Sequence, residues 1–200
     1  MAQSSTTISP QKSFVASFNI AEGLNFTAST KRISATTTLI SGSGKLAVRD
    51  IFTTSSSINP GPFTVATVAS DNRTITVEET LTDEDRDGST ASSVSFNGFV
   101  TDKYKGDGYY SQADGLHTVA YHVSSNLNDD STIILKMQGS LATDPTESDW
   151  FDIDNTTIDQ TDIDGSTLAF SVNFTGNFVW VRAKVTGMSA GFISKILYNH

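Results

Sequence analysis

The chain has 200 residues and a formal net charge of −9, and Ser and Thr make up more than a quarter of it. This length suits one large β domain or two small ones. The negative charge would repel phosphate backbones, so we expect no nucleic-acid binding. The sequence contains no cysteine, which excludes disulfides and thiolate chemistry.

Neither a membrane segment nor a signal peptide is predicted. No stretch approaches the roughly 20 apolar residues that span a bilayer. Residues 1–20 lack a basic segment followed by a long apolar run. We therefore expect a protein that is made in the cytoplasm and has no membrane partner.

The N-terminal residues 1–12 are polar, rich in Ser and Thr, and include Pro10. Such a terminus is typical of a disordered tail. The alternative is an arm that becomes ordered against a neighbouring subunit. In the predicted organisation, this arm precedes one β domain over residues 13–112 and a second over residues 113–200.

From residue 13 onward the chain breaks into short segments in which apolar and polar residues alternate, as in half-buried strands. In the first half, strands are predicted at residues 13–20, 32–40, 45–53, 63–69, 73–81 and 93–100. Residues 41–44 are Ser-Gly-Ser-Gly and favour a hairpin loop. Residues 70–72 favour another hairpin, which is the clearest of the chain.

Residues 102–116 are loop-like, so the boundary between the two domains is placed there. Beyond it, strands are predicted at residues 117–125, 132–138, 149–153, 168–174, 177–185 and 191–198. Strands that recur about every 8–12 residues are typical of sandwiches and jelly rolls. The predicted fold class is all-β, with two β-sandwich or jelly-roll-like units and essentially no helix.

An acidic segment resembles the start of a calcium loop. Asp83, Asp85 and Asp87 occupy alternate positions before Gly88, a pattern that can point carboxylates inward. The position of the closing Glu is taken by Val94, and no helices are predicted around the segment. An acidic, solvated turn is therefore the favoured interpretation, and calcium bound by the three Asp residues is the alternative.

The remaining polar residues form no catalytic pattern. His117 and His122 differ in strand parity, so a regular strand points them to opposite faces and they do not form a zinc pair. No nucleophile elbow or phosphate loop is present. The acidic residues of 144–164 are irregularly spaced and are interpreted as a solvated rim that could meet a cation or a basic partner. We therefore expect no enzymatic activity.

Several aromatic residues lie near the predicted boundary. Tyr104, Tyr109, Tyr110 and Tyr121 cluster there in the sequence, and Trp150 follows further on. Exposed aromatic rings can stack on sugars or anchor a protein partner. The alternative is that they fill the space between the two halves.

In the strand over residues 177–185, Trp180, Arg182 and Lys184 share one face, while Val181 and Val185 share the other. The Val face is predicted to be core. The Trp180–Arg182 face is predicted to be either a second packed layer or an interface, since a guanidinium over an indole is favourable.

The C-terminal part resembles a known family. Residues 138–141 (QGSL), 148–151 (SDWF) and 176–183 (GNFVWVRA), with a closing strand at 193–198, look like a β-sandwich module of bacteriophage virion proteins. Within that group, residues 115–200 are most similar to small structural proteins of contractile-tailed phages of marine cyanobacteria. The resemblance implies no catalytic residues.

The resemblance implies a virion protein that assembles in the cytoplasm of its bacterial host and binds other virion proteins. We expect a homo-oligomer, such as a trimer, in a capsid-decoration, neck or tail position. A carbohydrate-binding or receptor-binding module of a tail or fibre is the alternative. It would use a glycan as ligand and the region of the Tyr residues or the acidic loops as its site.

Overall fold

The computed structural model describes residues 5–85, 90–110, 115–125, 127, 132–163 and 168–200. It confirms the all-β class, because the helical segments in the described part are short 3₁₀ turns. These include η1 (Ala28–Thr30), η2 (Asp107–Tyr110) and η4 (Glu147–Asp149). Among the described residues, no helix has the length and apolar character needed to cross a membrane.

The chain divides into two compact units. One is Val15–Phe99, and the other combines residues 100–200 with the N-terminal segment up to Phe14. The sequence places the division at residue 112 and treats residues 1–12 as an arm. In the structure, Ser5–Ser9 is instead a strand that pairs with a C-terminal strand of the same chain, where Ile8 is buried.

The unit Val15–Phe99 is a run of antiparallel strands. Its strands are β3 (Phe18–Ile20), β4 (Asn25–Thr27), β5 (Arg32–Ser34), β6 (Asp50–Thr54), β7 (Phe63–Val68), β8 (Thr74–Val77) and β9 (Ser92–Val100). They neighbour one another in the order β3–β9–β6–β7–β8–β5–β4. The predicted β7–β8 hairpin is confirmed, and Asn72 in its turn adopts a positive φ of 56°. The interior includes Ile20, Leu24, Ile33, Phe52, Val65, Ile75 and Val94, all fully buried.

One predicted hairpin of this unit is not formed. The strands expected on either side of residues 41–44 are largely loop, and β5 pairs with β4 and β8 instead. Ile40 and Leu46 are fully buried although they lie outside strands. Their backbone N–H groups are hydrogen-bonded outside a strand ladder, since Leu46 N donates to Ile40 O and Ile40 N donates to Asn72 O. Burial of these two side chains therefore produces the apolar pattern that suggested strands.

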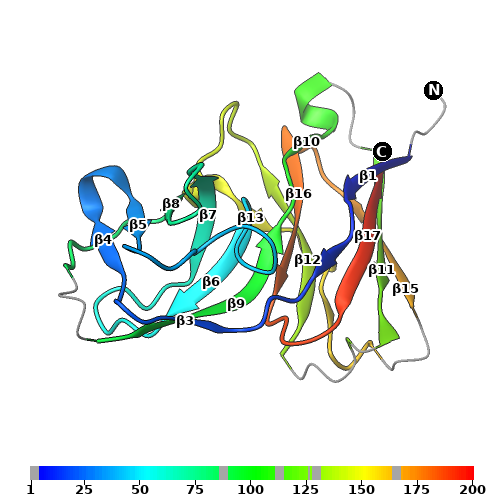
Figure 1. Ribbon diagram of the computed structural model, residues 1–200. Helices are drawn as coiled ribbons and strands as arrows, with labels where there is room; N and C mark the ends of the chain where they lie inside the picture. The colour runs from blue at the N-terminus through cyan, green and yellow to red at the C-terminus, as the bar shows by residue number, and fades with distance from the viewer. Residues whose placement is uncertain (1–4, 86–89, 111–114, 126, 128–131, 164–167) are drawn as a thin grey trace. The chain divides into compact units, whose positions relative to one another are not determined.

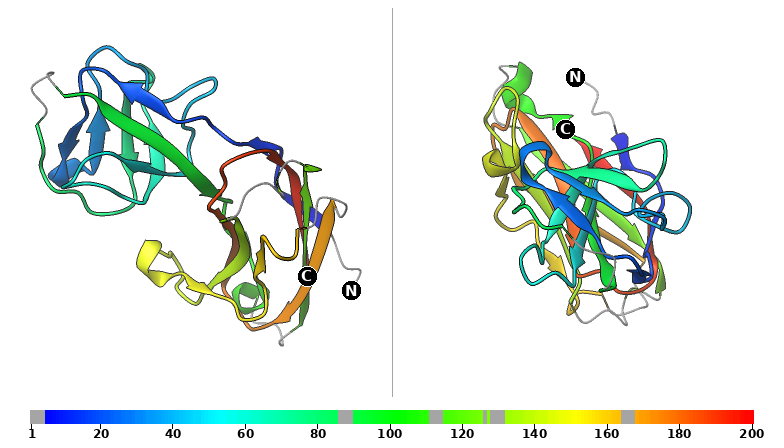
Figure 2. Two further views of the ribbon diagram at one scale, coloured as in Figure 1. Left: turned by 90° about the horizontal axis from the view of Figure 1, so that it is seen from below. Right: turned by 60° about the vertical axis from the view of Figure 1, so that its left-hand side comes forward.

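The other unit is a sandwich of two antiparallel sheets (Figures 1 and 2). In the first sheet the strands follow the order β1–β17–β11–β15, and β2 also pairs with β17. In the second sheet β12 pairs with β16 on one side and with the short strands β13 and β14 on the other, and β10 pairs with β16. The strands are β1 (Ser5–Ser9), β2 (Lys12–Ser13), β10 (Tyr104–Lys105), β11 (Leu116–Val123), β12 (Ile134–Ser140), β13 (Phe151–Asp152), β14 (Ile158–Asp159), β15 (Ala169–Thr175), β16 (Trp180–Thr186) and β17 (Phe192–Asn199).

Alternation along the strands builds the core of this sandwich. On β16, Val181 and Val185 are fully buried, and on β11 Val119 and Tyr121 are too. The predicted inward Val face of β16 is confirmed. Because side chains alternate across a strand, Trp180, Arg182 and Lys184 lie on the opposite face of this sheet. The sandwich therefore offers an outer sheet face and two edges on which side chains can act.

Candidate functional site

Four of the predicted binding residues come together at one edge of the sandwich. The Tyr109 ring centroid lies 5.0 Å from that of Trp180 and 5.2 Å from that of Tyr110. Tyr104 is on β10, paired with β16. Tyr109 and Tyr110 are 41% and 48% exposed. We call Tyr104, Tyr109, Tyr110 and Trp180 the aromatic platform.

Two glycines hold the η2 turn of the platform against the chain that leads into β16. Gly108 N donates to Phe178 O at 2.8 Å and Gly106 N donates to Val179 O at 3.0 Å. A Cβ atom on Gly106 would lie only 2.4 Å from Phe178 O. Trp180 is fixed in turn, because its Nε1 donates to Thr143 O at 2.9 Å.

Lysine side chains cover the rings of the platform. Lys103 Nζ lies 4.7 Å from the Trp180 ring centroid, and Lys105 Nζ lies 4.1 Å from that of Tyr109. These distances are those of cation–π contacts. A pocket of about 410 Å³ beside the rings is lined by both lysines and by His200. Lys103 also forms an ion pair with Asp144 at 2.9 Å. Burial, and then the charge of Asp102, raise the pKa of Tyr104.

Beneath the platform lies a buried polar network around His117, which is fully buried. Its Nε2 is 3.1 Å from Gly176 O and 3.4 Å from Asp107 Oδ2, and its Nδ1 is 2.7 Å from Tyr198 Oη. Both neighbours of Nε2 are acceptors, so we assign the ring proton to Nε2 and a donating hydroxyl to Tyr198. Burial, and then the charge of Asp107, raise the pKa of Tyr198. The network satisfies its own polar groups, as a structural core does.

Trp150 and Arg182 form a second group on the outer face of β16 and β12. The Arg182 guanidinium carbon lies 4.3 Å from the Trp150 ring centroid, and its Nε donates to Gln138 Oε1 at 2.9 Å. Glu147 accepts two further hydrogen bonds from the same guanidinium. Arg182 is only 3% exposed. Each of its three nitrogen atoms therefore donates a hydrogen bond within the chain.

The predicted calcium loop is only partly described by the structure. Asp83 Oδ1 accepts a hydrogen bond of 2.7 Å from Ala28 N, Asp85 is exposed, and Asp87 lies outside the described residues. The carboxylate of the intervening Glu84 accepts hydrogen bonds from Ser56 Oγ and Asn59 Nδ2. In the part of the chain that the structure describes, no three acidic, His or Cys side chains gather as a metal site.

Acidic residues of 144–164 are engaged locally. Asp149 accepts hydrogen bonds from the backbone N and Oγ1 of Thr146, which lower the pKa of this exposed carboxyl. Asp159 accepts equivalent bonds from Thr161, with the same effect on its pKa. These carboxylates terminate turns and cap short segments, which explains their irregular spacing.

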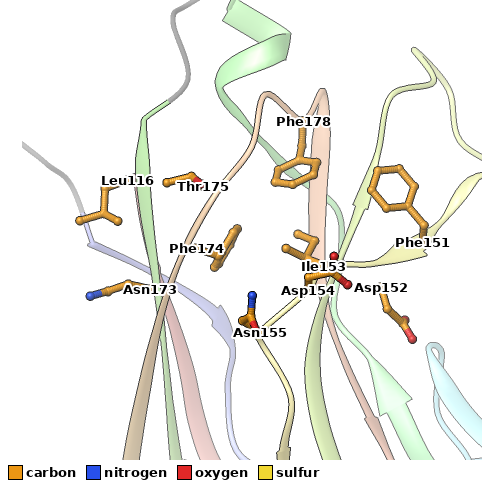
Figure 3. A pocket seen from close by; sticks show the side chains of 10 residues that line it. All are labelled: Leu116, Phe151, Asp152, Ile153, Asp154, Asn155, Asn173, Phe174, Thr175 and Phe178. Carbon is orange, nitrogen blue, oxygen red and sulfur yellow. The ribbon is translucent and has the colours of Figure 1, made fainter.

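A cleft of about 530 Å³ lies at the opposite edge of the sandwich, beside β13 and β15 (Figure 3). We call it the Phe cleft. It is lined by Leu116, Phe151, Asp152, Ile153, Asp154, Asn155, Asn173, Phe174, Thr175 and Phe178. The sequence did not single it out, because its walls come from four separate segments. The one local signal was Phe151, a large apolar side chain in an otherwise acidic stretch, which is 43% exposed.

Glycines make room for the central ring of this cleft. A Cβ on Gly139 would lie 2.5 Å from the Phe178 ring, and one on Gly176 would lie 2.2 Å from it. The Phe178 ring centroid is 6.0 Å from that of Phe151 and 6.3 Å from that of Phe174. Three aromatic rings thus surround the cleft, as Figure 3 shows.

Comparisons with known proteins add little. No family model matches the chain, and no curated protein matches it. A solved structure described as a xylan-binding module, CBM15, is similar over 77% of this chain and 93% of its own, at 14% sequence identity and a TM-score of 0.34. A likeness at this TM-score carries no argument about function.

Proposed function

We propose that this protein is a non-enzymatic structural component of a bacteriophage virion and acts through protein–protein contacts. The observation that carries the proposal is the open edge of the first sheet of the sandwich. β15 is seven residues long, and within the described residues it pairs only with β11. Open backbone N–H and C=O groups on such an edge can accept a strand from another chain.

The exposure of β15 fits this role. Its burial pattern leaves alternate residues exposed, whereas β11 beside it buries every second side chain. At the other end of the same sheet, β1 pairs with β17 and forms a second edge. A sheet with two edges can be extended from both sides, which suits a homo-oligomer or a repeated virion component. The resemblance of residues 115–200 to phage virion modules points to the same class.

The proposal is tested on the intact particle and on the purified chain. Cross-linking with mass spectrometry of purified virions is expected to place this chain beside other virion proteins. A Ser171→Lys change puts a charge on the outer face of β15 and is expected to weaken association in light scattering. Ala120→Lys, opposite Ser171 on the central strand β11, is the matched control. Absence of the chain from virions would contradict the proposal.

A second candidate function is binding of a carbohydrate or receptor. Exposed aromatic rings at both edges of the sandwich favour it, since ring faces stack on sugars. Tyr109 and Tyr110 are exposed at the platform and Phe151 at the cleft. A glycan array on the intact chain tests this function, and an array with no reproducible binding would contradict it.

A further inference from the structure

We infer that the Phe cleft is a binding site for a neutral saccharide. The inference deepens the second candidate function. Asn173, Phe174 and Thr175 of β15 line the cleft, but Phe151 and Asp154 lie outside that strand and allow the site to be tested apart from virion assembly. It assigns the ligand to the cleft and not to the aromatic platform. Five properties of the cleft support this: its size, its ring faces, its free polar groups, its charge and its rigidity.

The size and wall of the cleft suit a short oligosaccharide. Its volume of about 530 Å³ lies in the range of roughly 300–1,000 Å³ that small-ligand sites occupy. Phe151 is 43% exposed and Leu116 is 52% exposed at its rim, while Phe174 and Phe178 are buried in its floor. Sugar rings present an apolar C–H face that packs on such surfaces.

Free hydrogen-bonding groups lie below the rings. The Asp154 carboxylate and the Asn155 amide line the cleft, and neither side chain has a hydrogen-bond partner among the described residues. A carboxylate accepts hydrogen bonds from hydroxyls, and an amide both donates and accepts. A sugar hydroxyl does both as well. An aromatic wall with a few convergent polar groups is the usual composition of a ligand site.

The charge of the cleft favours a neutral ligand. Asp154 and Asp152 both line it, so an anionic sugar would meet like charge. Partial burial would raise the pKa of Asp152. Hydrogen bonds from Lys136 and Gln138, together with the charges of Lys136 and Lys184, outweigh it and lower the pKa. Asp152 is therefore ionised at neutral pH and held by these partners, which leaves Asp154 to contact a hydroxyl.

The floor of the cleft is held in place before any ligand arrives. Thr156 is fully buried, and its hydroxyl donates to Ile153 O at 2.6 Å and accepts from Met137 N at 3.1 Å. Ile153 N donates to Met137 O at 3.0 Å. These bonds tie the segment that carries Asp154 and Asn155 to β12. A site that is already ordered loses less conformational entropy on binding.

The aromatic platform is less suited to a sugar because its ring faces are occupied. Lys105 lies over Tyr109 and Lys103 lies over Trp180. A sugar would have to displace these contacts before it could stack. None of the described lysines or arginines lies over Phe151 in a comparable contact.

The test is titration calorimetry of the full chain with soluble cello-, xylo-, manno- and galacto-oligosaccharides. At least one of these neutral series is expected to bind. Phe151→Ala removes an exposed ring and is expected to lower the affinity about tenfold. Asp154→Ala is expected to lower it several-fold, because a carboxylate acceptor is lost. The matched controls are Tyr109→Ala and Tyr110→Ala at the platform, which leave the affinity unchanged.

Two outcomes overturn the inference. No heat with any of the series at millimolar concentration removes the site, whereas the second candidate function is judged by the glycan array. Binding that is lost in Tyr109→Ala and retained in Phe151→Ala keeps the second candidate function but moves its site to the platform. Circular dichroism of each variant verifies that the sandwich is folded. The virion proposal is judged separately, since Phe151→Ala is expected to leave light scattering unchanged.

Discussion

The Arg182 guanidinium donates two hydrogen bonds to the Glu147 carboxylate, from Nη1 to Oε1 at 2.7 Å and from Nη2 to Oε2 at 2.8 Å. The Arg182 side chain is 3% exposed and the Glu147 side chain is 25% exposed. The two-bond geometry matches the planar fork of the guanidinium to the carboxylate. A guanidinium buried to this extent is destabilising unless an anion compensates its charge. The Glu147 carboxylate is therefore expected to stabilise the outer face of β16.

Glu147→Ala is expected to lower the free energy of unfolding by about 3 kcal/mol, because it leaves a buried guanidinium without its carboxylate. Urea denaturation followed by circular dichroism measures this loss. The control is Asp144→Ala, which breaks a surface ion pair with Lys103 and is expected to cost less than about 1 kcal/mol. Equal effects of the two variants would contradict the role of burial.

Tyr198→Phe is expected to destabilise the sandwich by about 1–2 kcal/mol. The change removes the hydroxyl that donates to Nδ1 of His117 and leaves a buried acceptor unpaired. Tyr110→Phe, at an exposed position, is the control and is expected to be neutral. Nitrogen NMR of His117 reports the tautomer directly, and a proton on Nδ1 in the native protein would contradict our assignment.

The stability of the unit Val15–Phe99 is expected to fall in acid through Glu22. Burial would raise the pKa of Glu22, but hydrogen bonds from Thr38 and Thr37 outweigh it and lower the pKa to about 2 from its ordinary value of 4.5. A lowered folded-state pKa gives stability that is complete above about pH 4.5 and is lost as the pH falls toward 2.

Glu22→Gln should therefore lower stability at pH 7 by about 1 kcal/mol and flatten the pH dependence between these limits. Thermal unfolding across that pH range is the measurement. The control is Glu78→Gln, because the Glu78 carboxylate makes no hydrogen bond with the described residues. An unchanged acid slope in Glu22→Gln would show that other groups cause it.

Gly139→Ala is expected to cost about 1–3 kcal/mol, because the new Cβ would overlap the Phe178 ring. Replacing Phe178 by the smaller Leu in the same chain should relieve the overlap, so the double variant is expected to lose less than the sum of the single changes. Chemical denaturation of all four proteins measures the coupling. Strict additivity would mean that the ring and the glycine do not compete for space.

Local patterns were sufficient for the strands that alternate and end in clear turns. The β7–β8 hairpin and the inward Val face of β16 are confirmed, since both depend on period-two alternation and on turn residues. The hairpin expected around residues 41–44 was wrong, because its two expected strands are shortened to β5 and β6, which pair with other strands. Ile40 and Leu46 are apolar because the core needs them, and the same pattern arises in a buried loop.

The candidate sites were likewise predicted only in part from the sequence. The sequence singled out Tyr104, Tyr109, Tyr110 and Trp180 one by one, and three of their rings meet in the structure. It could not show that lysines cover these rings. The Phe cleft was missed altogether, because Phe151, Phe174 and Phe178 come from different segments.

The sequence by itself determined the all-β class, because a Thr-rich, alternating chain without sustained helical periodicity satisfies its backbone only in sheets. Tertiary structure decided the rest. It paired Ser5–Ser9 with the C-terminal strand, enclosed Arg182 with Glu147, and brought Phe151 and Phe178 to one edge. Each of these features depends on contacts between residues that are distant in the chain. Such contacts follow from sheet pairing and burial, and they produce no local sequence pattern from which they could be predicted.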